Sequence, residues 1–167
     1  YTFADSLYNL YTETVKGIKA PVYNAMGNHE IYGIYSRSGA DPLHPEFGEK
    51  MFEKRIGRSY YSFEHKGWKF FILNSVEDTG KDGYMGFIDP VQTEWIREEL
   101  GKTDTLTPVV IATHIPFITV NSQIYNYSTA ANDSGLVVVN SRDILKLFSH
   151  HNLKLVLQGH LHMVEDI

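Results

Sequence analysis

The amino-acid sequence predicts an α/β protein with a single domain over residues 1–167. Segments in which apolar residues recur at helical spacing alternate with short apolar segments rich in β-branched residues. Three of these apolar segments end in groups of Gly, Asn and His, which is typical of ligand sites at the carboxyl ends of strands. The 167 residues, of which 43% are hydrophobic, are enough to bury a hydrophobic core.

The first third of the chain predicts a helix, a strand and a second helix. Apolar residues recur at helical spacing over residues 3–15, and Gly17 marks the end of this helix. The segment APVYNAM, residues 20–26, is typical of a short buried strand. Residues 34–45 are rich in Gly, Ser and Pro and predict a loop, and residues 46–57 predict a short helix.

The middle of the chain predicts a hairpin and a capped helix. Residues 59–75 contain two strand-like segments on either side of a Lys-Gly turn at residues 66–67. A helix is predicted over residues 90–100, with Asp89 as its N-cap because an Asp side chain accepts hydrogen bonds from the first free N–H groups. Pro90 suits the first helical position, where its missing N–H is not needed.

The last third predicts a strand, a loop, a helix and a final strand. Residues 107–114, TPVVIATH, form a β-branched segment that ends in a histidine. Residues 121–135 predict a polar loop, and residues 140–151 predict a helix capped by Asn140. Residues 153–162, LKLVLQGHLH, predict a strand that ends in two histidines.

Composition and charge exclude several classes of function. The net charge of -5 argues against a protein that binds a nucleic-acid backbone. There is no cysteine, which excludes disulfides and thiolate metal sites and suits the cytoplasm and the periplasm equally. No apolar segment approaches the ~18 residues of a membrane span, so we expect a soluble protein. The chain opens with Tyr1, so we expect a native N-terminus, with any targeting signal, to lie upstream.

Polar side chains follow three predicted strands, at the points where the strands end. Asn28 follows the first, His114 the second, and His160 and His162 the third. Because the carboxyl ends of strands lie along one edge of an open α/β sheet, we expect these side chains to converge. An amide oxygen and several imidazoles form a mixed site that suits divalent Zn, Mn, Fe or Ni.

These side chains belong to three short motifs, which occur in the order Gly27-Asn28-His29-Glu30, Thr113-His114-Ile115-Pro116 and Gly159-His160-Leu161-His162. In order, spacing and strand-end position they resemble the motifs of the calcineurin-like metallophosphoesterase superfamily. Within this superfamily they resemble the motifs of the bacterial Icc-like phosphohydrolases, to which the purple acid phosphatases are related. The segment IDPVQTEWIREEL, residues 88–100, also resembles a helix of this family. Each motif alone is weak, and the three together are specific.

The resemblance implies a fold and a metal centre. The fold is a two-sheet β-sandwich flanked by helices, and the cofactors are two divalent metals at the edge of the sandwich. One ion would be bound by Asn28, His114 and His160, and the other would be bound by His162.

The resemblance also implies hydrolysis of a small phosphoester substrate. Two ions about 3.5–4 Å apart supply a hydroxide at neutral pH and stabilise the oxygens of an in-line displacement. His29 would lie beside the reacting phosphate and neutralise charge or protonate the leaving group. Glu30 would orient His29 through a hydrogen bond.

Two motifs of the family are missing from this sequence. The family carries Asp-x-His on its first strand and Gly-Asp-x-x-Asp or -Asn on its second, and neither occurs here. We therefore expect a chain that lacks its first strands and the carboxylate that bridges the two ions. Such a chain would be an incomplete, inactive fragment that holds one ion or none. We also expect a homodimer that covers the exposed strands.

Two other functions stay open. The first is a non-catalytic binding or scaffold module that keeps the phosphoesterase fold and has lost its metal centre. The second is a mononuclear zinc-binding domain that uses Asn28, His114 and His160. The sequence does not distinguish a mono- from a diester, or a nucleotide from a lipid or protein substrate, and it leaves the metal and the compartment open.

Overall fold

The computed structural model describes residues 2–167. Its helices are α1 (Thr2–Val15), α2 (Lys50–Arg55), α3 (Pro90–Gly101), α4 (Asn121–Tyr125) and α5 (Ser141–Leu147), with 3₁₀ turns at Asn28–Glu30 and Ser36–Ser38. Its strands are β1 (Tyr61–His65), β2 (Trp68–Ile72), β3 (Val76–Asp78), β4 (Tyr84–Gly86), β5 (Pro108–Ala112) and β6 (Asn152–Leu157). Over this range no helix combines the length and the hydrophobicity that crossing a bilayer requires.

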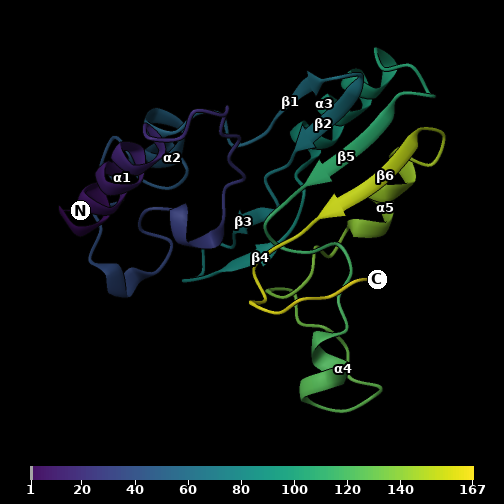
Figure 1. Cartoon of the computed structure of the whole chain (residues 1–167). Coiled ribbons are helices and arrows are strands. Elements are labelled where there is room, and N and C mark those ends of the chain that lie inside the picture. Colours follow the sequence, from purple (N-terminus) through teal and green to yellow (C-terminus); the bar gives the residue numbers. More distant parts are fainter. Residues whose placement is uncertain (1) are drawn as a thin grey trace.

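The strands form two sheets, which confirms the predicted α/β class with two sheets and flanking helices (Figure 1). The larger sheet has the order β1-β2-β5-β6. β1 and β2 are the predicted antiparallel hairpin, whereas β2 pairs with β5, and β5 with β6, in parallel. β3 and β4 form a separate antiparallel pair. The ends of β5 and β6 therefore lie at the same edge of the larger sheet, as expected for strands that deliver a site.

The core lies between the larger sheet and helices α3 and α5, which cover one of its faces (Figure 1). Phe71 of β2 is fully buried there, and its ring meets the edges of Trp95 and Phe148 at centroid distances of 6.0 and 5.3 Å. The predicted cap of α3 is confirmed, because the Asp89 side chain accepts hydrogen bonds from the N–H groups of Val91 and Gln92.

The predicted strand at residues 20–26 is wrong, because no residue of this segment is assigned to a strand. The segment contacts the sheet through side chains instead. Tyr23 stacks on Phe63 with the ring centroids 3.6 Å apart, and Phe63 stacks on Phe70 at 4.7 Å. Within residues 2–167 no strand forms β-sheet hydrogen bonds with the backbone of this segment, so its backbone does not adopt a strand.

Several other boundaries differ from the prediction. The predicted loop at 121–135 contains α4, and α5 is shorter than the predicted helix over 140–151. Asn140 does not cap α5 with its side chain, because that amide bonds both the N–H and the C=O of Ile88. β6 ends at Leu157, so both histidines of its motif lie in the following loop.

The outer edge of the larger sheet carries exposed apolar side chains. β6 is the last strand in the sheet order, and Leu155 and Leu157 on it are about half exposed. An open edge of this kind is free to pair with another strand. The expected homodimer stays a prediction.

Candidate metal centre

Two histidines of the site are carried by the parallel strands β5 and β6. His114 follows the end of β5, and His160 follows the end of β6. The N–H of Gly159 donates to the carbonyl oxygen of His114 at 3.0 Å. This backbone hydrogen bond continues the pairing of the two strands into the loops, so the two imidazoles are brought to the same edge of the sheet.

Asn28 comes from a different part of the fold, the 3₁₀ turn Asn28–Glu30. The residue is buried, and its Oδ1 lies 2.8 Å from Nε2 of His114. This approach requires a glycine at position 27, because a Cβ there would lie 2.9 Å from Cε1 of His114. The Gly-Asn pair thus allows the turn to lie directly against the imidazole.

His160 completes a group of three donor atoms. Its Nδ1 lies 3.1 Å from Nε2 of His114, and its Nε2 lies 2.9 Å from the carbonyl oxygen of Gly135. Because a carbonyl oxygen only accepts hydrogen bonds, Nε2 carries the proton and Nδ1 presents its lone pair. A metal-binding histidine is commonly oriented by such a bond from its other nitrogen. The ring of Tyr84 also meets His160 edge-on, at a centroid distance of 5.7 Å.

The electrostatics of the site favour neutral imidazoles. Burial, together with the charges of His160, His29 and His162, lowers the pKa of His114 to about 4. Burial also lowers the pKa of His160. Neutral imidazole is the form that binds a metal ion. His114 Nε2 here donates to Asn28 Oδ1, so its proton would have to move to Nδ1 before Nε2 could bind an ion.

The loop after β6 is strained at both of its histidines. His160 has φ 72° and His162 has φ 54°, in the left-handed region that residues other than glycine seldom occupy. Backbone strain of this kind is found preferentially at functional sites. Here it belongs to the two residues of the motif that were predicted to bind metal.

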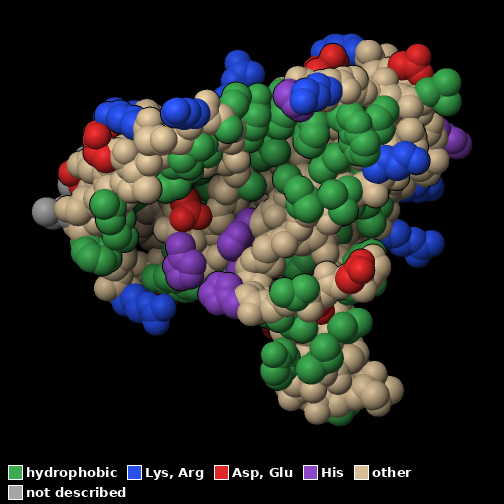
Figure 2. All heavy atoms as spheres, viewed as in Figure 1, with side chains coloured by type: hydrophobic (Ala, Val, Ile, Leu, Met, Phe, Trp, Pro, Cys, Tyr) green, Lys and Arg blue, Asp and Glu red, His purple; other side chains and the backbone are tan. Residues whose placement is uncertain are grey.

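The predicted site residues separate into an inner group and a peripheral pair. Asn28, His114 and His160 are in direct contact, whereas His29 and His162 are exposed at the rim of the same region. Figure 2 shows histidine side chains gathered in one patch on this face of the molecule. The peripheral pair lies close enough for its charges to lower the pKa of His114.

The inner group suits a divalent ion in its chemistry. Its atoms are one amide oxygen and two imidazole nitrogens, a mixed set typical of borderline metals. Asn28 Oδ1 lies 2.8 Å and His160 Nδ1 lies 3.1 Å from His114 Nε2. Within residues 2–167 no group of three His, Cys, Asp or Glu side chains is arranged to hold an ion. The inner group contains two histidines, and its third member is the amide of Asn28. A site of three donors leaves positions open for water or substrate.

Glu30 has a different partner from the one expected. Its carboxylate accepts a hydrogen bond from the N–H of Gly27 at 2.8 Å, and no hydrogen bond to His29 occurs among the described residues. The N–H of Glu30 in turn donates to the carbonyl oxygen of Gly27 at 3.2 Å. Glu30 therefore closes the turn that carries Asn28.

Sequence reasoning missed two groups that hold His160. Tyr84 lies on β4, a strand of three residues that is too short for a periodic pattern. Gly135 acts through its backbone carbonyl, which leaves no mark in the sequence.

A cavity of about 510 Å³ borders the turn on the side of α1. Its lining includes His29 and Glu30, together with apolar side chains such as Leu7, Tyr11 and Phe52. His29 thus borders a mostly apolar cavity and is adjacent in sequence to Asn28 of the inner group.

Comparison with known proteins identifies a family for this chain. A model of the family described as calcineurin-like phosphoesterase matches residues 3–164. No curated protein matches the chain, and no solved structure matches it. The matched range contains all three motifs and both sheets, so it covers the whole candidate site. The chain therefore belongs to the calcineurin-like phosphoesterase family.

Proposed function

We propose that this chain, as one domain over residues 1–167, carries the metal site of a phosphoester hydrolase. Asn28, His114 and His160 would hold one divalent ion, of Mn, Fe, Zn or Ni. The observation that carries the proposal is the convergence of Asn28 Oδ1 and His160 Nδ1 on His114 Nε2, at 2.8 and 3.1 Å. Burial supports it, because it keeps the imidazoles neutral and able to bind a metal.

Each side chain has a distinct part in the proposed chemistry. A bound divalent ion would act as a Lewis acid on a phosphoryl oxygen and lower the pKa of a water molecule. His29, exposed beside Asn28, would donate a hydrogen bond or a proton to the phosphate or to the leaving oxygen. His162 would help to hold a second ion. The cavity next to His29 would take the organic part of the ester.

Metal titration and turnover test the proposal together. The protein is stripped of metal, titrated with Mn²⁺ or Zn²⁺, and then assayed with an aryl phosphate and an aryl phosphodiester. We expect at most one ion per chain, at the inner group. Product that forms only when the ion is present would show hydrolysis by this chain, whereas an ion bound without product would show the inactive fragment expected from its missing motifs. Asn28→Ala, His114→Ala and His160→Ala should each lose the ion, whereas His65→Ala, a change in the exposed hairpin, should retain it. Full retention of the ion in all three inner-group variants would refute the assignment.

A non-catalytic binding module is the second candidate, and one observation favours it. The sequence contains neither Asp-x-His nor Gly-Asp-x-x-Asp, so the carboxylate that bridges two ions in this family has no counterpart among its motifs. Such a module, having lost the two-ion centre, would bind a phosphate-bearing ligand without turning over an ester. Calorimetry with inorganic phosphate on the metal-loaded protein, beside the turnover assay, separates the two functions.

A further inference from the structure

The three donors of the inner group are supported in different ways. His114 and His160 follow paired strands, and the hydrogen bond from Gly159 N–H to the His114 carbonyl oxygen joins their loops. Asn28 has no such support, because residues 20–26 form no strand in front of it. Some other contact must hold the turn so that the Asn28 side chain meets His114.

The first such contact lies within the turn. The carboxylate of Glu30 accepts from the N–H of Gly27 at 2.8 Å, and the Gly27 carbonyl accepts from the N–H of Glu30 at 3.2 Å. Asn28 and His29 lie between these two residues. The two hydrogen bonds close a ring around them, and the carboxylate end of that ring is charged, which strengthens the bond it accepts.

The second contact comes from helix α1. The hydroxyl of Tyr8 donates to the backbone carbonyl oxygen of Glu30 at 2.9 Å. Burial and the neighbouring charge of Glu30 raise the pKa of the Tyr8 phenol well above its ordinary value, so the hydroxyl stays protonated and remains a donor. A residue 22 positions earlier in the chain thus fixes the far end of the turn.

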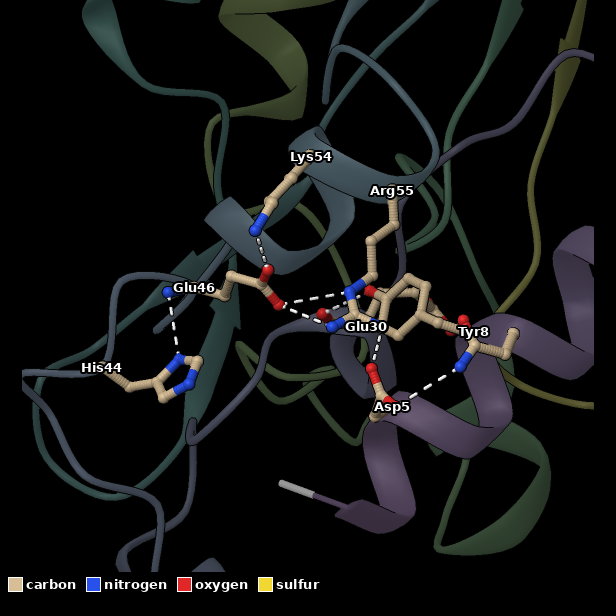
Figure 3. A network of polar contacts seen from close by, with 8 residues as sticks. Asp5, Tyr8, Glu30, His44, Glu46, Lys54 and Arg55 are labelled. Atoms are coloured by element: carbon tan, nitrogen blue, oxygen red, sulfur yellow. Dashed lines mark hydrogen bonds and ion pairs between the residues drawn. The ribbon is translucent and has the colours of Figure 1, made fainter.

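Tyr8 is in turn held by an ionic network between α1 and α2 (Figure 3). The guanidinium of Arg55 lies over the Tyr8 ring, 5.7 Å from its centroid. The same guanidinium pairs with Asp5, one turn before Tyr8 on α1, and with the buried Glu46 at 2.7 Å. Lys54 also binds Glu46. The network fixes the side of α1 that faces the turn, because Asp5 and Tyr8 lie three residues apart on one face.

We propose that Tyr8 and Glu30 are positioning residues, which together clamp the turn so that Asn28 reaches the ion-binding position. The inference rests on the proposed function, and it assigns to α1 a part in the proposed metal centre through the hydrogen bond from Tyr8 to Glu30. Without the clamp the turn would sample other conformations, and the ion would have to order it again on binding.

The decisive variant is Tyr8→Phe, with Tyr11→Phe as its matched control. Tyr8→Phe keeps the ring under Arg55 and removes only the hydroxyl that reaches Glu30. Tyr11→Phe removes the same group from the same helix, but that hydroxyl donates to the side chain of Asn24 and not to the turn. Two quantities are measured: the Kd of the metal-stripped protein for Mn²⁺, and the amide hydrogen exchange of residues 27–30 without metal.

Tyr8→Phe should weaken Mn²⁺ binding about 10-fold, the lower end of the effect of losing an outer contact to a metal ligand. It should also speed exchange at residues 27–30, whereas Tyr11→Phe should leave both quantities within about twofold of the parent. Glu30→Ala should act like Tyr8→Phe, and Glu30→Gln should restore most of the affinity, since its side-chain oxygen still accepts from Gly27.

The two readouts separate this inference from the proposed function. If the parent protein binds no metal, the proposed function fails, and the exchange measurement alone decides whether the clamp exists. Wild-type affinity and wild-type exchange in Tyr8→Phe would overturn the clamp. Equal losses in Tyr8→Phe and Tyr11→Phe would also overturn it, because the effect would then belong to α1 in general.

Discussion

Gly27→Ala should damage the proposed metal centre without removing any of the groups proposed to bind the ion. Gly27 has φ -111° and ψ 178°, a conformation that alanine adopts freely, so the substitution adds no backbone strain. The new Cβ, however, would lie 2.8 Å from Oε2 of Glu30, 2.9 Å from Cε1 of His114 and 3.0 Å from its Nδ1. Ordinary contacts of a Cβ begin at 3.4 Å, so the carboxylate and the imidazole must each move by about half an ångström.

The displacement acts on both supports of the inner group. Moving the imidazole separates His114 Nε2 from Asn28 Oδ1, and moving the carboxylate opens the hydrogen bond that closes the turn. We expect the Kd for Mn²⁺ to rise about 10–100-fold, as it does when an outer contact of a metal ligand is lost. The free energy of unfolding should fall by about 1–3 kcal/mol, the usual cost of overpacking.

Gly159→Ala is the matched control, because this glycine also lies against His114. A Cβ at position 159 would be 3.7 Å from Nδ1 and from the carbonyl oxygen of His114, which is ordinary contact. Metal titration of both variants, with thermal unfolding beside it, gives the comparison. If Gly27→Ala binds Mn²⁺ as tightly as Gly159→Ala does, the close approach of the turn to His114 has no bearing on the ion.

Three further predictions concern the substrate side, the pH dependence and the core. His29→Ala should weaken inorganic phosphate binding to the metal-loaded protein about 10-fold or more by calorimetry, through the loss of a charge-assisted hydrogen bond, while the Kd for the metal stays constant. Hydrogen bonds from Ser62 and Lys102 lower the pKa of Glu99 to about 2, so its stabilisation is present above pH 4.5 and is lost as the pH falls through about 2. After allowance for solvent screening this contributes about 1 kcal/mol, and acid unfolding of Glu99→Gln should show a correspondingly flatter pH dependence. Phe71→Ala empties the space between the sheet and its two helices and should lower the free energy of unfolding in urea by about 3–5 kcal/mol; a loss below about 1 kcal/mol would contradict that placement.

Local chemistry made much of the fold predictable. The Asp-Pro pair at 89–90 predicted both the start and the cap of α3, because the cap depends only on hydrogen bonds within the first turn. The Lys-Gly turn at 66–67 predicted the β1–β2 hairpin, and both of its residues have positive φ as a tight turn requires. In each case the information lies within a few neighbouring residues.

Elements that depend on distant partners were not predictable in this way. Residues 20–26 have the composition of a strand, yet a strand also needs a neighbour to pair with. β3 and β4 have three residues each and exist through pairing with each other. Asn140 is suited to cap a helix, but its amide is taken by the backbone of Ile88, 52 residues away.

The candidate site divides along the same line. The meeting of His114 and His160 was predictable because each follows a strand and the two strands pair in parallel. Asn28 follows no strand, so its approach to His114 through the 3₁₀ turn was not predicted by the strand-end argument. The contacts that orient them come from Tyr84, Gly135 and Tyr8, which share no pattern with the motifs. These contacts join residues that are far apart in the sequence, so no local pattern of residues predicts them.

The parallel pairing of β5 and β6 has a consequence for how the molecule folds. Parallel neighbours cannot be joined by a tight turn, and here the chain between Ala112 and Asn152 must be placed before the second strand can dock. Such nonlocal pairing forms slowly, since the entropy of closing the long loop is lost before the contacts are gained. His114 and His160 meet only when β5 and β6 have paired. An ion that binds both histidines would bind the folded chain and not the unfolded one, and would therefore stabilise the folded state by mass action. The yield of refolded protein would then depend on the metal concentration.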